Sequence, residues 1–178
     1  MQNAKNLTPV ILFLVVTGFA LYYFETRLQQ TAPQETATST AVVYRNDEFG
    51  FTFAMPDSWR GFLIVHTTWE GNSLLAPSTT QTGTKILIRH PQWTADQPYE
   101  DIPVLVFTIA QWNLYLAEAF TVSAAPVPAI ELGKNNQYVF ALPPRWNFDY
   151  LEGYEEAEAI VASSPLTAFA VETPMSQN

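Results

Sequence analysis

The stretch that decides the fold class is Phe62-Leu63-Ile64-Val65-His66-Thr67-Thr68-Trp69, followed by Lys85-Ile86-Leu87-Ile88-Arg89-His90. Both segments are rich in the β-branched and aromatic residues that favour strands. The residues between them, Gly71 to Thr84, are rich in Ser, Thr and Gly and predict an exposed, mobile loop. We expect the two strands to pair antiparallel with Trp69 opposite Lys85, which places His66 and His90 diagonally on one sheet face.

Further strands are expected on both sides of this pair. A segment that contains three prolines, Pro91 to Pro103, blocks regular structure directly after it. Gly133 to Asn136 has the composition of a tight turn and predicts a hairpin between the segments that flank it. The additional strands are apolar or alternating segments rich in β-branched and aromatic residues, namely residues 42–45, 49–55, 104–108, 129–132 and 137–142.

Two helices complete the expected domain. Thr108 is suited to cap the first helix. The second helix runs from about Leu151 to Ala162. Because strands, helix, hairpin and helix follow one another without βαβ alternation, residues 42–170 are predicted to form an α+β domain, an antiparallel sheet with helices packed on it. The apolar stripes expected to face the core are Ile109, Trp112, Leu116 and Phe120 in the first helix, and Leu151, Tyr154, Ala157 and Val161 in the second.

The N-terminal residues 1–28 predict a signal anchor that crosses a membrane once. No charged side chain lies between Leu7 and Phe24, which amounts to about 27 Å of helix. Lys5 precedes this run, so the positive-inside rule favours a cytoplasmic N-terminus and an extracytoplasmic domain in the cell membrane. A cleaved signal peptide is the alternative, but bulky Tyr22 and Tyr23 stand where small residues precede a cleavage site.

Composition describes the segments outside the domain and excludes several classes of partner and site. Residues 29–41 are small and polar and predict a disordered tether, and residues 171–178 predict a disordered tail. The net charge of −9 opposes the phosphate backbone, so we expect no nucleic-acid partner. With no cysteine, the chain has no disulfide, thiol nucleophile or Cys-ligated metal site.

One motif resembles a known family. The pattern Tyr44-x-Asn46-x-x-x-Gly50-Phe51-Thr52-Phe53-x-x-Pro56-x-x-Trp59 is similar to the start of PsbP-like domains. The strings Ile88-Arg89-His90-Pro91-x-Trp93-Thr94 and Tyr138-Val139-Phe140-Ala141-Leu142-Pro143 look like those of small bacterial surface proteins of this type. The resemblance implies an antiparallel sheet sandwiched by helices, and a binding or assembly module without catalysis. The photosystem II role of the plant subunit does not carry over, because none of its metal or docking residues can be placed here.

The sequence contains no signature of a common enzyme class. It has no phosphate-binding Gly-rich loop, no His-Glu-x-x-His helix and no Gly-x-Ser-x-Gly elbow. His66 and Glu70 are about 13 Å apart along a strand, too far to share one metal ion. The acidic residues between Asp149 and Glu158 favour a solvated helix face over a calcium site or a catalytic pair. We therefore predict no enzyme, with no catalytic residue, no metal ligand and no cofactor.

Five residues are candidates for recognition. Both proline-bounded segments, Pro91 to Pro103 and Pro143 to Tyr150, are expected to run over the surface and form one recognition site. Arg and Trp are enriched at binding hot spots. The predicted partner is a protein or an envelope component, the alternative is a glycan stacked on exposed tryptophans, and a hydrolase comes third. The equally weighted structural explanation is that the arginines pair with nearby carboxylates and the tryptophans close the core. The candidates are Arg89, His90, Trp93, Arg145 and Trp146.

Overall fold

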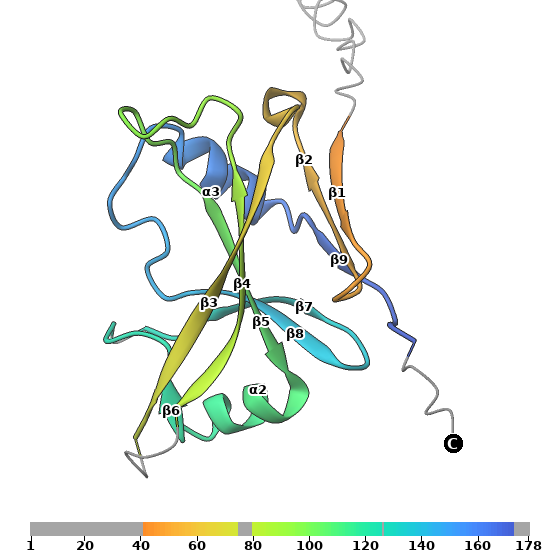
Figure 1. Ribbon diagram of the computed structural model, residues 1–178, viewed down its shortest axis with the longest axis vertical. Coiled ribbons are helices and arrows are strands. Elements are labelled where there is room, and N and C mark those ends of the chain that lie inside the picture. Colours follow the sequence, from red (N-terminus) through yellow and green to blue (C-terminus); the bar gives the residue numbers. More distant parts are fainter. Residues whose placement is uncertain (1–40, 75–79, 126, 173–178) are drawn as a thin grey trace, which may run out of the picture. The chain divides into compact units, whose positions relative to one another are not determined.

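The computed structural model describes residues 41–74, 80–125 and 127–172 of the chain (Figure 1). Over these residues the chain forms nine β-strands, two α-helices and one short 3-10 helix. The expected anchor over residues 1–28 and all but the last residue of the expected tether lie outside this part. None of the helices in the described part has the length and apolar composition needed to cross a membrane.

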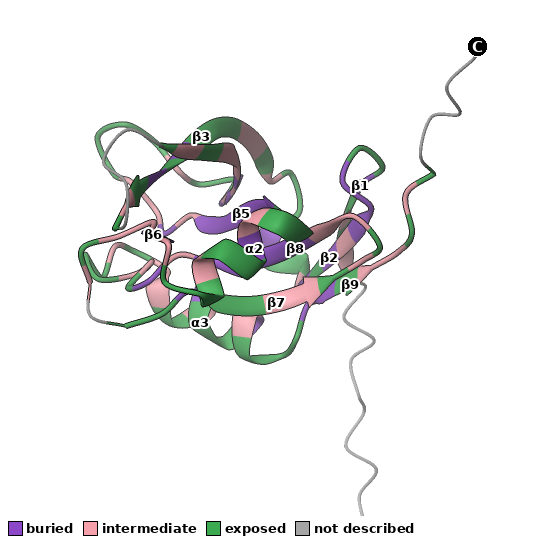
Figure 2. Ribbon diagram, turned by 90° about the horizontal axis from the view of Figure 1, so that it is seen from below, coloured by how far each residue is buried: buried purple, intermediate pink, exposed green. Residues whose placement is uncertain are grey.

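The larger of two sheets is fully antiparallel and has the strand order β6-β3-β4-β5-β8-β7. Its strong curl, with β3 arching away from β5 and β8, is clear in Figure 2. Buried residues concentrate in β5 and β8. Its strands are β3 (Leu63–Ser73), β4 (Gln81–Arg89), β5 (Ile102–Thr108), β6 (Phe120–Thr121), β7 (Ile130–Lys134) and β8 (Tyr138–Leu142).

The smaller sheet has three strands in the order β1-β2-β9. Strands β1 (Val42–Asn46) and β2 (Phe51–Met55), where the sequence predicts two strands, pair as a hairpin, and β9 (Leu166–Ala168) adds to β2. A 3-10 helix, η1 (Asp57–Trp59), follows β2 and buries Trp59. This sheet carries Phe51 and Phe53, which join the main core.

The six-stranded sheet is buried on both faces near its middle, because β5 alternates between two apolar clusters. Ile102, Val104 and Val106 pack with the small sheet and with helix α3 (Tyr154–Ala162). Leu105 and Phe107 point to the other face. There they pack with four aromatic residues, Trp69, Trp112, Tyr115 and Phe120. Burial on both faces makes β5 one continuous apolar run, as a central strand requires.

The predicted α+β sheet sandwiched by helices is wrong, and so is the fold that the PsbP resemblance implies. The structure is mostly antiparallel β, and its two short helices, α2 (Ile109–Leu116) and α3, cover only parts of the sheet. The small sheet takes much of the place expected for a helical layer. Pairing of Phe53 with Leu166 creates this sheet, and no local pattern announces a partner so distant in sequence.

The pairing of the opening two strands also differs from expectation. Thr67, not Trp69, lies opposite Lys85, so the register is shifted by two residues. His66 therefore faces Ile86, and His90 lies beyond the end of β4. Much of the expected loop between these strands is strand. Gly83 is needed there because the Trp69 ring lies on it, and a Cβ at this position would be 2.6 Å from the indole.

Helix α2 begins with the expected cap, α3 begins after Gly153 without a side-chain cap, and the buried stripes of both helices are narrower than expected. Thr108 caps α2 and forms a reciprocal capping box with Gln111, as its position predicts. Only Trp112 is fully buried in α2, while Leu116 is 63% exposed and Phe120 belongs to β6. Helix α3 begins at Tyr154, later than predicted, and its buried residues are Ala157 and Ile160.

Candidate functional site

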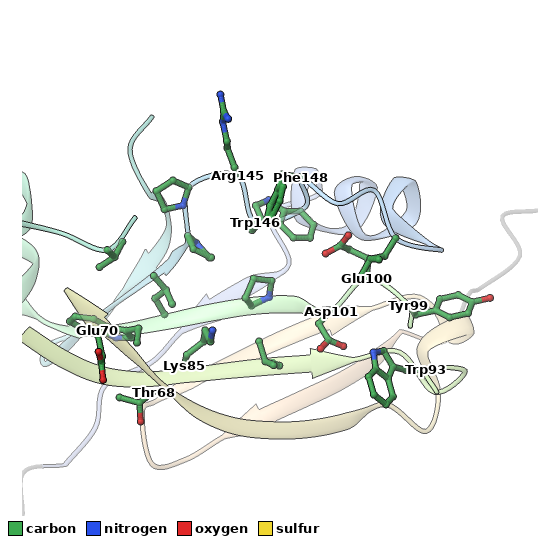
Figure 3. Close-up of a pocket in the computed structure, with 18 residues that line it drawn as sticks. Thr68, Glu70, Lys85, Trp93, Tyr99, Glu100, Asp101, Arg145, Trp146 and Phe148 are labelled. Atoms are coloured by element: carbon green, nitrogen blue, oxygen red, sulfur yellow. The ribbon is translucent and has the colours of Figure 1, made fainter. Parts of the chain in front are cut away.

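A cleft of about 570 Å³ lies on the curled sheet, between β3, β4 and β5 on one side and the segment Pro143 to Leu151 on the other (Figure 3). Its size is within the range of sites that hold compact organic ligands. Both proline-bounded segments of the sequence contribute to its lining. Beside the cleft, the Glu100 N–H donates to the carbonyl of Glu152 at 2.8 Å, which ties the first segment to the residues that follow the second.

The floor of the cleft is a row of side chains on β4. Successive residues of a strand alternate between faces, so Lys85, Leu87 and Arg89 point to the same side, about 7 Å apart. Register with β5 places Leu105 opposite Lys85 and Pro103 opposite Leu87. The floor thus has a cation, Lys85, beside an apolar centre, whereas Arg89, next on the same face of β4, does not line the cleft.

Arg89 is paired within the protein. Its Nε donates to Asp101 Oδ1 at 3.1 Å and its Nη2 to Oδ2 at 2.8 Å, with both side chains largely buried. These hydrogen bonds raise the pKa of the guanidinium, so it keeps its charge. The guanidinium also lies 3.8 Å from the centre of the Trp93 ring. Arg89 therefore holds Trp93 at the edge of the cleft and offers no free charge to a ligand.

His90 lies outside the cleft lining. It is 5% exposed and stacks on Tyr99, with ring centres 4.4 Å apart, while the edge of Trp59 meets it from another side. Its Nδ1 accepts the Gln92 N–H at 3.2 Å, so the neutral ring carries its proton on Nε2. Burial lowers the pKa of His90. The packing makes it a support for the Pro91 to Pro103 segment.

The cleft is lined by Trp93, Arg145 and Trp146. This agrees with the expectation that the two proline-bounded segments contribute to one site. Trp93 and Trp146 are half-buried, and Trp146 also packs against the main core. Arg145 is exposed and points away from the sheet (Figure 3), from a backbone with a φ of 51°. The guanidinium groups of Arg89 and Arg145 thus do not converge.

Two polar residues of the cleft were not foreseen. Glu100 is 6% exposed, and its Oε2 has no hydrogen-bond partner among the described residues. Burial raises the pKa of Glu100, and the backbone N–H of Leu151 opposes this effect. Lys85 forms no ion pair within the described part of the chain. The sequence signal for Glu100 is a carboxyl next to a fully buried strand. The signal for Lys85 is its two-residue spacing from Leu87 and Arg89, which puts it on the same face of the strand.

The histidines and the carboxylates of α3 do not gather into a metal site in the described part of the chain. No group of three or more His, Asp or Glu side chains suited to a metal occurs in the described ranges. His66 is exposed on β3, apart from buried His90. On α3, Glu156 accepts a hydrogen bond from Ser58 and Glu158 accepts one from Asn147. These carboxylates tie the helix to neighbouring segments.

Comparisons with protein families, with curated proteins and with solved structures return no match for this chain.

Proposed function

We propose that this chain is a membrane-anchored, extracytoplasmic binding module, with residues 1–28 as its anchor, and that the cleft above β4 is its recognition site. The observation that carries the proposal is the composition of the cleft. Its walls present half-exposed Trp93 and Trp146, while in the described part of the chain Lys85 forms no ion pair and the Oε2 of Glu100 no hydrogen bond. Apolar walls with a few convergent polar groups are typical of ligand sites.

Exposure of the aromatic rings supports recognition over core packing. Trp59, Trp69 and Trp112 are each at most 7% exposed and fill the two apolar clusters. Trp93 and Trp146 keep part of their surface accessible, and Phe148, on the same wall, is 65% exposed. Large aromatic surfaces beside a cleft contribute strongly to the binding free energy when a partner covers them.

The charges of the cleft favour binding over hydrolysis. Glycoside hydrolysis uses two carboxyl groups, one as acid and one as base or nucleophile. Glu100 has the raised pKa of such an acid, but both oxygens of neighbouring Asp101 bind Arg89. Asp101 is therefore committed to holding Arg89 and Trp93.

The proposal is tested by photo-crosslinking in intact cells from a benzoylphenylalanine placed at position 148. Phe148 is an exposed aromatic on the cleft wall, so the probe fits without repacking the core. The matched control carries the probe at position 43, because Val43 is 53% exposed on β1 and does not line the cleft. We expect a discrete adduct from position 148 that is absent from position 43. The same adducts from both positions, or none from position 148, would contradict the proposal.

A further inference from the structure

We infer that the outer edge of β3 pairs with the same edge of a second copy of this chain, antiparallel and about a two-fold axis at Thr67. Strand β3 lies at the rim of the curled sheet in Figure 2. Short β6 pairs only with its last two residues, Asn72 and Ser73. From Leu63 to Gly71, β3 has β4 on one side and no strand on the other side within the described residues. The inference goes beyond the proposed function and does not depend on it.

Even-numbered residues of β3 direct their backbone groups to this outer edge. In an antiparallel sheet a residue turns its N–H and C=O to one neighbouring strand, and the next residue turns them to the other. Directly after β5, the Ile109 N–H donates to the carbonyl of Gln137, so odd-numbered residues of β5 face β8 and even-numbered ones face β4. Register across β4 then directs odd-numbered residues of β3 to β4 and even-numbered ones outward. The Leu74 N–H agrees with this, because it donates to Ala119 on the β6 side.

The outer edge therefore offers a row of hydrogen-bonding groups, the N–H and C=O of Ile64, His66, Thr68 and Glu70. Within the described part of the chain, none of these backbone groups has a hydrogen-bond partner. His66, Thr68 and Glu70 are exposed, and Ile64 is half-buried. Such a row is a template on which another strand can pair.

The other sheet edges carry features that oppose pairing with a further strand. Strand β7 has a bulge between Glu131 and Gly133 and ends at Lys134. Strand β1 has five residues and carries Arg45, and β9 has only three residues. Strand β3 has 11 residues and no Lys, Arg or Pro. Bulges, cations, prolines and short strands are the usual protection of an edge, so β3 is the edge left open to a partner.

A second copy of the chain fits this edge in register. With Thr67 opposite Thr67 of the second copy, His66 lies opposite Thr68, and Ile64 lies opposite Glu70. Each outward-facing residue then meets another outward-facing residue, so all of their N–H and C=O groups find partners. Neither His66 nor Glu70 lies opposite the same residue of the second copy, so no like charges stand directly opposite one another.

The charges near the edge also favour a second copy. The whole chain carries a net charge of −9, so two copies repel one another overall. Strands β3 and β4 together hold one carboxylate, Glu70, and two cations, Lys85 and Arg89. Two copies that meet along β3 therefore bring together a region that lacks the acidic excess of the rest of the chain.

Disulfide crosslinking of the full chain in detergent tests the inference. The chain has no cysteine, so a single introduced cysteine reports only on its own position. Thr67 is exposed and lies on the proposed axis, where the Cα atoms of a non-hydrogen-bonded pair are about 4.5 Å apart, within the range of a disulfide. We expect Thr67→Cys to form a disulfide-linked dimer at least about tenfold faster than either control variant, because pairing raises its effective concentration.

The two controls are Leu63→Cys and Val43→Cys, at positions that are 59% and 53% exposed. The two copies of Leu63 would lie about 27 Å apart along the paired strands, which no disulfide spans. Val43 lies on β1, in the smaller sheet. Leu63→Cys therefore tests the register, and Val43→Cys gives the rate of crosslinking by collision.

A proline at position 66 tests the backbone pairing itself. His66→Pro removes an outward N–H and leaves the bonds between β3 and β4 in place, as a proline on an edge strand does. In the Thr67→Cys chain it should slow crosslinking to the rate of Val43→Cys, whereas His66→Ala, which keeps the N–H, should not. The melting temperature of His66→Pro should stay within about 4 °C of the parent chain. A larger fall would show that this N–H bonds β4, and would overturn the inference.

Photo-crosslinking in intact cells from benzoylphenylalanine at position 67 identifies what occupies the edge. We expect an adduct with the mass of two copies of the chain. The inference is overturned by no adduct, by an adduct with a different protein in its place, by equal disulfide rates at positions 67, 63 and 43, or by fast crosslinking that persists in His66→Pro. These measurements use position 67 and no ligand of the cleft. Their failure therefore leaves the result from position 148, and with it the proposed function, unaffected.

Discussion

At the scale of single residues, two buried ionisable groups next to the cleft give the stability of the fold opposite dependences on pH. Burial lowers the pKa of His90 and raises the pKa of Glu100, because in each case it disfavours the charged form. His90 supports the segment that carries Trp93, and Glu100 lies in the cleft wall. Stability near the site should therefore decrease towards acid pH through His90 and towards higher pH through Glu100.

For His90 we predict an acid-side loss of stability. Its pKa is lowered from 6.5, so the unfolded chain binds the proton more readily, and the free energy of unfolding decreases as pH falls below about 6.5. His90→Asn should flatten this part of the curve, because the amide oxygen can accept the Gln92 N–H without titrating. The variant should also lose about 1 kcal/mol of ring stacking. Denaturant unfolding at several pH values measures both effects; an unchanged acid slope would contradict the assignment.

For Glu100 the free energy of unfolding depends on pH in the opposite direction. Its pKa is raised from 4.5, so the folded chain holds the proton more tightly, and the free energy of unfolding decreases as pH rises above about 4.5. Glu100→Gln should flatten the curve on this side. Glu155→Gln, at an exposed position of α3, serves as the control and should leave the slope intact. The assignment fails if the two variants show the same pH profile.

At the scale of elements, Asn135 joins the β7–β8 hairpin to the smaller sheet. Its Nδ2 donates to the carbonyls of Phe49, Gly50 and Phe169, and its Oδ1 accepts two backbone N–H groups of the turn. Asn135→Ala should lower the free energy of unfolding by about 2–4 kcal/mol, because these backbone groups lose a partner in a partly buried place. Asn136→Ala is the matched control.

Asn136 is exposed, and among the described residues its side chain hydrogen-bonds only the backbone of Val171, so its replacement should change the unfolding free energy by less than about 1 kcal/mol. Chemical denaturation of the two variants gives the comparison. Equal losses would show that the side chain of Asn135 does not join the sheets. Val171 is also the position where the sequence places the start of the disordered tail, of which residues 173–178 lie outside the described residues.

Gly83 marks a second element-scale requirement, the close approach of Trp69 to β4. The Trp69 Nε1 donates to the carbonyl of Val106 at 2.9 Å, which fixes the indole over the glycine. Gly83→Ala should cost about 1–3 kcal/mol, because the added methyl group displaces the ring. Thr82→Ala, at an exposed position of the same strand, should stay within about 0.5 kcal/mol. A red shift of tryptophan fluorescence in Gly83→Ala alone would report the displaced indole.

Local pattern was sufficient where one segment decides its own structure. The cap at Thr108, the strands β1 and β2 and the central strand before α2 all follow from a few neighbouring residues. Local pattern did not predict the structure where contacts between distant segments decide it. The glycines around β3 and β4 resembled a loop, because nothing local shows that Trp69 will lie on Gly83. The pairing of β2 with β9 was not predicted for the same reason.

At the scale of the whole molecule, the candidate site was partly predictable. The rule that irregular segments on a rigid sheet carry binding groups placed both proline-bounded segments in one site. The sequence did not show that Arg89 pairs with Asp101 or that His90 packs between the Trp59 and Tyr99 rings, because these partners come from other elements. Lys85 and Glu100 escaped notice because burial and missing partners are properties of the folded chain.

The expected topology is also a property of the whole chain. If residues 1–28 anchor it with the N-terminus inside, protease added to spheroplasts should remove the domain while intact cytoplasmic proteins remain as the internal control. Protection of the domain, or a soluble product that begins near Thr31, would contradict the anchor. The readout is immunoblotting of the membrane and soluble fractions.

The most direct test of the recognition site compares adduct yield and melting temperature in Trp93→Ala. We predict at least a tenfold loss of the adduct formed from position 148. The melting temperature should fall by no more than about 4 °C, because the ring contributes mainly a partly exposed contact with Arg89. Trp69→Ala, in the buried cluster, shows how far the melting temperature falls when a core tryptophan is removed. Full adduct yield from Trp93→Ala, together with a fall in melting temperature like that of Trp69→Ala, would make Trp93 a core residue and contradict the account.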